Sequence, residues 1–165
     1  MLFGIVIYLF VLQGLQHYNP QEGCRMLASE MSNHIIIGYT HLGARLVEHL
    51  QHARQPYVLV EKDPTAVDHL VRAGEPVIVD DAKQTTTLEQ AGAARARLIA
   101  VTSNNIETAL LLTKRVRESN PKAPIVVRCF LDDFTEILET LGATLVISSS
   151  KSAFNEVARY IGGSD

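Results

Sequence analysis

The sequence predicts an α/β fold of the Rossmann type, in which a doubly wound, parallel six-stranded sheet carries helices on both faces. The first observation is a regular alternation of short apolar runs with amphipathic stretches after residue 32. The second is a turn with two glycines, Gly38–Gly43, between the first apolar run and the first amphipathic stretch. The third is an acidic residue, Glu61, that ends the second apolar run roughly 20 residues after Gly38.

The first half of the pattern contains three strands, each followed by a helix. Asp63 is a suitable N-cap and Pro64 suits the first position of a helix, so the second helix begins there, and Gly74 follows its end. Short apolar runs without alternation are typical of strands that are buried in a parallel sheet. In chain order, we expect these elements at residues 34–38 (strand), 42–53 (helix), 57–60 (strand), 64–73 (helix), 76–79 (strand) and 87–91 (helix).

The second half repeats this alternation. Its longest amphipathic stretch aligns Ile106, Ala109, Leu110, Thr113 and Val116 along one side of a helix. In chain order, we expect elements at residues 97–101 (strand), 104–118 (helix), 125–128 (strand), 132–141 (helix), 144–147 (strand) and 151–161 (helix). Six strands that alternate with six helices through short connections indicate a parallel sheet covered on both faces.

Residues 1–32 differ from the nucleotide-binding domain expected at residues 33–165. Residues 1–12 are almost entirely apolar and contain no Asp, Glu, Lys or Arg. A membrane-spanning helix needs about 20 apolar residues, so this run is too short alone. It is the end of a spanning helix, an interfacial anchor or a helix that packs on a partner, and we favour the first interpretation. Residues 13–32, which contain Asn19-Pro20, are expected to form a linker.

The composition argues against several classes of protein. The chain has 165 residues and a formal net charge of −3, and its Lys and Arg residues are scattered, so no nucleic-acid partner is expected. The two cysteines, Cys24 and Cys129, form no CxxC pair and have no group of histidines beside them. We therefore expect free thiols in a reducing cytosol, and neither a disulfide framework nor a metal site.

The turn Gly38–Gly43, called the glycine loop below, is the expected ligand site, because ligands of doubly wound sheets bind beyond the carboxyl ends of the strands. The dinucleotide-binding fingerprint is G-x-G-x-x-G. Gly38 makes the turn and Gly43 permits close packing of helix on strand, but Thr40 replaces the middle glycine. The Thr40 side chain crowds a pyrophosphate, although its hydroxyl can itself hydrogen-bond to a phosphate. The N-terminus of the helix is a favourable anion site.

Polar side chains follow the other strands as well. The position of Glu61 suits a carboxylate that holds ribose hydroxyls and disfavours a 2′-phosphate. Asp80-Asp81 ends the third strand and is either a helix-capping corner or a contact on the adenine side. The residues 102–105 (TSNN) end the fourth strand, and they cap the next helix at the rim of the crevice.

Arg128 ends the fifth strand, where a charge is unexpected in an apolar run. It can reach a ligand phosphate or a carboxylate such as Asp132 or Asp133, and the residues alone favour the ion pair. The sequence shows no catalytic set. Its six histidines are dispersed, only His41 lies in the glycine loop, and no Gly-x-Ser-x-Gly, HExxH or P-loop lysine motif occurs.

With these residues in place, the chain resembles the RCK or KTN family, the cytoplasmic regulatory domains of potassium channels and transporters, also described as TrkA-N type. The likeness covers about residues 33–161. The matching segments are IIIGYTHLG at 35–43, VLVEKDP at 58–64, VDDA at 79–82, LEQAG at 88–92, LIAVT at 98–102 and IVVR at 125–128. Two positions depart from the family pattern: Thr40 stands for the middle glycine and His41 for a common arginine.

The resemblance implies a cofactor site for NAD(H) or an adenine nucleotide such as ATP, ADP or AMP. It implies that the glycine loop surrounds phosphates, that Glu61 holds the ribose and that Asp81 and Ala82 lie beside the adenine. For Arg128, it implies a contact with a phosphate in place of the ion pair that the residues alone favour. The complete expected set is Gly38, Tyr39, Thr40, His41, Leu42, Gly43, Glu61, Lys62, Asp80, Asp81, Ala82, Thr102, Ser103 and Arg128.

The function that the resemblance implies is a nucleotide sensor at the cytoplasmic face of the cell membrane, rather than an enzyme. Such domains form homodimers, and often an octameric ring, that act on a potassium channel or transporter subunit. Nucleotide binding then favours one arrangement of the dimer, and that arrangement opens or closes the pore. The alternatives are a small NAD-dependent oxidoreductase and an assembly domain with an empty pocket.

Overall fold

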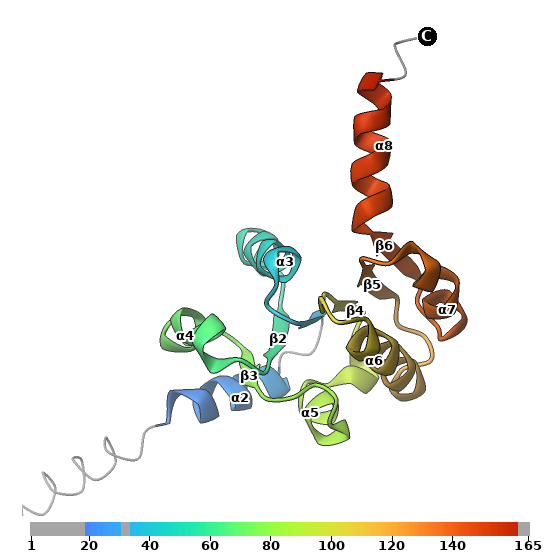
Figure 1. The fold of residues 1–165 in the computed structure, drawn as a ribbon. Coiled ribbons are helices and arrows are strands. Elements are labelled where there is room, and N and C mark those ends of the chain that lie inside the picture. The colour runs from blue at the N-terminus through green and yellow to red at the C-terminus, as the bar shows by residue number, and fades with distance from the viewer. Residues whose placement is uncertain (1–18, 31–33, 162–165) are drawn as a thin grey trace, which may run out of the picture.

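The centre of the molecule is a six-stranded, all-parallel sheet with the strand order β3-β2-β1-β4-β5-β6 (Figure 1). This computed structural model describes residues 19–30 and 34–161. The strands are β1 (His34–Ile37), β2 (Tyr57–Glu61), β3 (Val77–Val79), β4 (Leu98–Val101), β5 (Ile125–Cys129) and β6 (Leu145–Ser148). All six lie where the sequence predicts them, with ends that differ by at most one residue. The predicted fold class is therefore confirmed.

Helices connect the strands, and six of the seven described α-helices overlap the predicted ones. They are α2 (Pro20–Glu30), α3 (His41–His52), α4 (Pro64–Arg72), α5 (Thr85–Gln90), α6 (Ile106–Ser119), α7 (Thr135–Thr140) and α8 (Ser149–Ile161). Short 3₁₀ turns occupy Ala93–Arg95 and Asp132–Phe134. The single helix predicted at 132–141 is therefore a 3₁₀ turn followed by α7.

The strand order reverses beside β1, and this reversal positions the site. Ile37, the last residue of β1, is paired with Val60 of β2 on one side and with Val101 of β4 on the other. The connections from β1 and from β4 therefore leave the sheet in opposite directions and open a crevice at their carboxyl ends. The glycine loop and the residues after β4 face each other across this crevice.

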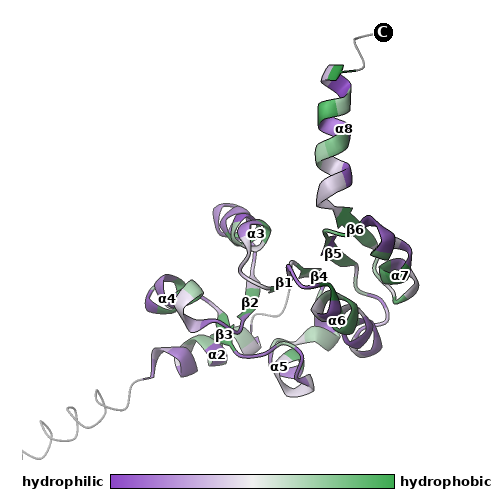
Figure 2. Cartoon of the chain, in the orientation of Figure 1, coloured by the Kyte–Doolittle hydropathy of each residue, from purple (hydrophilic) through white to green (hydrophobic). Residues whose placement is uncertain are grey.

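Two clusters of buried side chains hold the helices on the sheet. One cluster includes Leu88 of α5, Leu112 and Val116 of α6, and Leu138 of α7. The other includes Val47 of α3 and Val67 of α4. Strand residues alternate between the clusters, because successive side chains of a strand point to opposite faces. Figure 2 shows the outcome, with hydrophilic residues on the outer sides of α3 and α4.

The helix α2 corrects the prediction of a linker at residues 13–32. Residues 20–30 are helical and pack against the edge strand β3 and against α4, and only Cys24 and Ala28 are buried. The helix was not predicted because its buried surface consists of two small residues, which give no apolar periodicity. The apolar run at residues 1–12 lies outside the described residues. Within the described part of the chain, no helix is both long and apolar enough to cross a membrane.

The last helix, α8, extends away from the body of the domain (Figure 1). None of its residues is buried, although it contains several large apolar side chains. Phe154 is 69% exposed, Val157 55%, Tyr160 85% and Ile161 80%. Its sequence periodicity predicted a helix correctly, but the apolar face of that helix has no covering within the described chain.

Candidate functional site

The glycine loop has the geometry that its two glycines predict. Gly38 has a φ of +101°, a conformation that side chains with a Cβ rarely adopt. Gly43 lies in the first turn of α3, where an added Cβ would be 2.1 Å from the backbone oxygen of Gly38. Both positions therefore require glycine for the backbone itself, and the first turn of α3 sits directly against the end of β1.

Thr40, which replaces the middle glycine of the fingerprint, is the N-cap of α3. Its Oγ1 accepts a hydrogen bond from the amide of Gly43 at 3.4 Å and donates one to the carbonyl of Thr102 at 3.0 Å. The hydroxyl of Thr102 in turn donates to the carbonyl of Gly38 at 2.7 Å. The two threonines thus join the glycine loop to the end of β4, and the Thr40 hydroxyl is already engaged within the protein.

Glu61, at the end of β2, binds two backbone amides. Its Oε2 accepts a hydrogen bond from the amide of Tyr39 at 2.6 Å, and its Oε1 accepts one from the amide of Asp63 at 2.9 Å. A carboxylate has about four lone-pair positions, so two stay available for the hydroxyls of a ribose. Glu61 therefore positions the glycine loop in addition to lining the site. Asp63 caps α4 through Thr65, and hydrogen bonds from Thr65 hold the pKa of the Asp63 carboxyl below its usual range.

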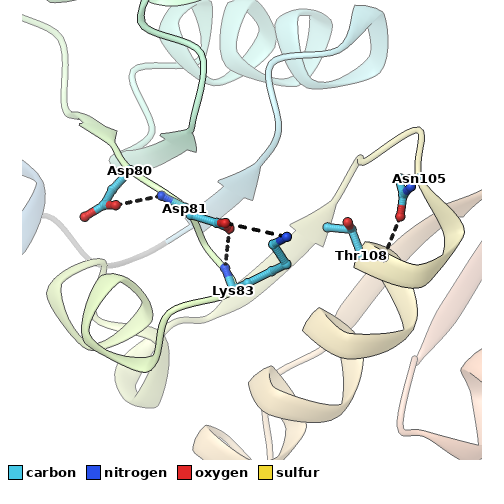
Figure 3. A network of polar contacts seen from close by, with 5 residues as sticks. All are labelled: Asp80, Asp81, Lys83, Asn105 and Thr108. Atoms are coloured by element: carbon cyan, nitrogen blue, oxygen red, sulfur yellow. Dashed lines mark hydrogen bonds and ion pairs between the residues drawn. The ribbon is translucent and has the colours of Figure 1, made fainter.

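The turn after β3 has two neighbouring carboxylates with different partners (Figure 3). Asp80 accepts a hydrogen bond from the amide of Asp81 at 2.8 Å and pairs with Arg25 of α2, with 3.2 Å between Nη2 and Oδ2. Asp81 accepts a hydrogen bond from the amide of Lys83 at 2.9 Å, and its other oxygen lies 3.6 Å from the Lys83 ammonium group. The turn is thus a capping corner and, at the same time, a part of the crevice wall.

The turn between β4 and α6 forms the opposite wall. Asn105 is the N-cap of α6 and accepts a hydrogen bond from the amide of Thr108 at 2.8 Å, as Figure 3 shows. The hydroxyl of Ser103 accepts one from the amide of Asn105 at 3.1 Å. Thr102 is buried, whereas Ser103 is half-buried and faces the crevice.

These walls enclose a cleft of about 370 Å³ at the carboxyl ends of β1 to β4. Eight of the predicted site residues line it, and they come from four separate turns. They are Gly38, Thr40, Glu61, Lys62, Asp80, Asp81, Ala82 and Ser103. The structure thus brings together most of a set that is dispersed along the sequence.

Six predicted residues do not line the cleft. Tyr39 turns to α4, where its hydroxyl lies 3.1 Å from Nε2 of His69, and His41 is exposed. Gly43 and Thr102 support the glycine loop from within the fold, and Leu42 is half-buried in the first turn of α3.

Arg128 lies in an adjoining cavity of about 270 Å³. It donates hydrogen bonds to Oδ1 of Asn104 at 3.0 Å and to the hydroxyl of Ser149 at 3.2 Å, and its guanidinium carbon is 4.1 Å from the centre of the Phe130 ring. In the described chain it forms no ion pair, so the pairing with Asp132 or Asp133 that the residues alone favoured is wrong. Asn104 belongs to both cavities and links Arg128 to the cleft.

Several residues that line the cleft are not among those that the sequence predicts. Lys83 follows the predicted Asp81-Ala82 pair directly, and its ammonium group neutralises part of the local negative charge. Glu107 and Thr108 line the cleft from the first turn of α6, and Leu112 from its second. The signal for Glu107 and Thr108 was their place after the capping Asn105, because the first turn of a helix after a parallel strand faces the same crevice.

The charges of the cleft are predominantly acidic. Its lining contains the carboxylates of Glu61, Asp80, Asp81 and Glu107, and the ammonium groups of Lys62 and Lys83. Within the described residues there is no group of three or more His, Cys, Asp or Glu side chains that could hold a metal ion. The cleft can therefore offer backbone amides, hydroxyls and carboxylates to a polar organic ligand.

The fold and the cleft define a Rossmann-type domain with a nucleotide-sized site at its strand reversal. Residues 34–149 match the model of the TrkA-N domain, and the chain belongs to that family. The expected resemblance is therefore confirmed. The matched range contains the complete sheet and every residue that lines the cleft, whereas α2 lies outside it.

The proteins to which this chain is similar include a potassium efflux antiporter, a channel and a Kef domain. The chain is 28% identical over 124 residues to the putative K(+) efflux antiporter KefB of Alkalimonas amylolytica, covering 74% of this chain and 19% of that protein. The chain thus spans about a fifth of the length of this curated relative. The structure of the GsuK channel bound to NAD is similar with a TM-score of 0.68 and 28% identity, covering 79% of this chain and 23% of that one. The Shewanella denitrificans Kef CTD in its AMP-bound form gives a TM-score of 0.64 and 25% identity, covering 81% and 83%.

Proposed function

We propose that this chain is the nucleotide-sensing regulatory domain of a potassium channel or transporter. The observation that carries the proposal is the cleft of about 370 Å³, lined by the glycine loop and by the ends of β2, β3 and β4. Its size and its place at the strand reversal suit an adenine nucleotide or NAD(H). The NAD-bound channel and the AMP-bound Kef domain among the similar structures support the same class of ligand.

Different residues of the cleft suit different parts of a nucleotide. Thr40, the N-cap of α3, lines the cleft, so a phosphate bound beside it would lie near the N-terminus of that helix, which is favourable for an anion. The remaining lone pairs of Glu61 suit ribose hydroxyls, and Ala82 leaves room for a base beside the turn after β3. Thr40 has its hydroxyl committed to Thr102 and Gly43, so we expect it to shape the loop rather than bind the phosphate.

A regulatory role is proposed in place of catalysis. No histidine, tyrosine or cysteine is among the residues that line the cleft of the described structure, so the usual proton-transfer groups of a dehydrogenase are not positioned there. The mechanism that we propose is a population shift: the nucleotide binds one arrangement of a homodimer or ring more tightly, and that arrangement acts on the membrane subunit at its cytoplasmic face. The exposed apolar side chains of α8 support a homodimer, because they need a covering surface.

Thermal unfolding with NAD, NADH, ATP, ADP and AMP tests the proposal. A nucleotide at about 100 times its Kd stabilises the folded state by about 2.7 kcal/mol, which raises the Tm of a domain of this size by about 5–10 °C. Ser103→Glu places a further carboxylate in the cleft and should abolish the shift. Ser152→Glu on the exposed surface of α8 is the matched control and should retain it. If no nucleotide raises the Tm, the alternative of an assembly domain with an empty pocket is favoured, and hydride transfer by the purified protein would favour the oxidoreductase.

A further inference from the structure

The helix α2 contacts the nucleotide cleft although it lies outside the matched family domain. Residues 20–30 precede the range 34–149 that matches the TrkA-N model, and they pack against the edge strand β3 (Figure 1). β3 leads directly into Asp80 and Asp81, which line the cleft. Only the short strand β3 therefore separates α2 from the cleft wall, so a displacement of α2 can move that wall.

The packing of α2 joins both faces of the sheet at this edge. Ala28 is fully buried in the same cluster as Ala82, which lines the cleft. Cys24, one helical turn earlier, is buried in the other cluster with Val71 and Val77, and its thiol lies 3.6 Å from the carbonyl of Val71. Small side chains at both contacts let the helix approach the strand closely. The position of α2 and the shape of the cleft wall are therefore mechanically connected.

An ion pair adds an electrostatic connection. Arg25 lies between the two buried residues in sequence, and its Nη2 is 3.2 Å from Oδ2 of Asp80. The other oxygen of Asp80 accepts the amide of Asp81, so the carboxylate is held by α2 on one side and by the cleft turn on the other. The side chains are 41% and 32% exposed, so the pair is partly accessible to solvent.

The net negative charge of the cleft indicates how this ion pair should affect the binding of a phosphate. The lining contains four carboxylates and two ammonium groups, a balance that repels the phosphate of a nucleotide. Arg25 does not line the cleft, but it neutralises the Asp80 carboxylate. When α2 is docked, the cleft is less negative, and a phosphate is bound more favourably than when α2 has left the sheet.

We propose that α2 is a positioning element for the nucleotide, and that docking of α2 and binding of a phosphate-bearing nucleotide favour each other. The inference rests on the proposed function, since it requires that a nucleotide occupies the cleft. Coupling of two equilibria is reciprocal: if docked α2 tightens the nucleotide, bound nucleotide tightens the docking of α2 by the same factor.

Titration calorimetry with AMP tests one direction of the coupling in the full chain. Arg25→Gln should weaken AMP binding by roughly two- to fivefold at low salt, the range of a partly exposed ion pair, and the difference should shrink as salt screens the charges. Arg25→Lys keeps the charge and should restore most of the affinity. Arg72→Gln is the matched control, because Arg72 pairs with Asp68 on the surface of α4 at 2.8 Å, away from the cleft, and it should bind AMP like the wild type.

Hydrogen exchange of the α2 amides tests the reverse direction. AMP should slow exchange at Cys24–Ala28 in the wild type, and should slow it less in Arg25→Gln. Equal AMP affinity of Arg25→Gln and the wild type at low salt, or exchange in α2 that AMP leaves unchanged, would overturn the coupling and leave the proposed function standing. If the wild type binds no AMP, NAD or ADP, the proposed function and the coupling both fail.

Discussion

The helices α2 and α8 flank the family domain, and they relate to the sheet in opposite ways. α2 is polar over most of its surface and still docks, by means of two small buried residues and one ion pair. α8 carries much more apolar surface and buries none of it within the described chain. α2 thus docks through the close approach of small side chains, whereas the apolar stripe of α8 has no covering within the described chain.

The largest expected effect concerns the apolar stripe of α8. If that stripe forms the proposed homodimer, Phe154→Asp buries an unpaired carboxylate in the interface and weakens dimerisation by roughly 10²- to 10³-fold. The fold of the monomer should stay intact, because Phe154 is 69% exposed. Sedimentation velocity measures the change, and Ser152→Asp on the opposite side of the helix should leave the dimer unaffected. A wild-type chain that is monomeric at high concentration would contradict the homodimer.

The next effect concerns the close approach of α2. Ala28→Asp places a carboxylate at a position with no exposed surface and should lower the free energy of unfolding by about 2–3 kcal/mol. Urea unfolding measures this loss. Ser29→Asp is the control on the same helix, since Ser29 is exposed, and it should have the stability of the wild type. Equal stability of the two variants would show that α2 contributes nothing to the folded state.

Thiol labelling contrasts the two helices directly. Burial raises the pKa of the Cys24 thiol, so the reactive thiolate is scarce, and α2 must leave the sheet before a reagent can enter. Ser152→Cys on α8 places a thiol on the exposed side of the helix, opposite the apolar stripe. Cys24 should react at least about tenfold more slowly than this thiol at pH 8, as mass spectrometry of labelled peptides measures. Comparable rates would mean that α2 is not docked in solution.

The smallest expected effect is that of the ion pair on labelling. Arg25→Gln should speed the labelling of Cys24 by roughly two- to fivefold without nucleotide, because a partly exposed ion pair contributes little to docking. Arg72→Gln should leave the rate unchanged, since its partner Asp68 lies on the same helix. An acceleration of a hundredfold would show that the ion pair, rather than the close packing, holds α2 in place.

The sequence predicts the strands well because a strand that is buried in a parallel sheet consists almost entirely of apolar residues. Each strand is a short run of β-branched or otherwise apolar residues, and register follows from their common ends. The same local signal, a capping residue followed by proline, occurs at two places with different outcomes. Asp63-Pro64 correctly predicts the start of α4. Asn19-Pro20 predicts part of a linker, whereas in the structure Asn19 caps α2 by accepting a hydrogen bond from the amide of Gln21 at 3.1 Å. The difference lay in the apolar periodicity that follows, which α2 lacks.

The sequence predicts which residues lie at the site better than it predicts their hydrogen-bond partners. Gly38, Glu61 and Asp81 line the same cleft because strand ends converge in this topology, and their contacts with a nucleotide stay a prediction. That Glu61 binds the amide of Tyr39 depends on how the glycine loop folds back over β2, which no local pattern records. Arg128 lies at the expected end of the sheet but in the adjoining cavity, where it donates hydrogen bonds to Asn104 and Ser149.

The contact between Gly43 and the carbonyl of Gly38 has a consequence for how relatives of this chain are compared. The requirement for glycine at position 43 comes from the loop's own backbone, so it persists whether or not a nucleotide is bound. A relative that binds no ligand would keep this glycine as long as it folds, while the half-buried Ser103 in the cleft wall would be free to change. Glycines in the loop are therefore evidence of a shared fold, whereas the residues of the cleft wall are the ones to compare for a shared ligand.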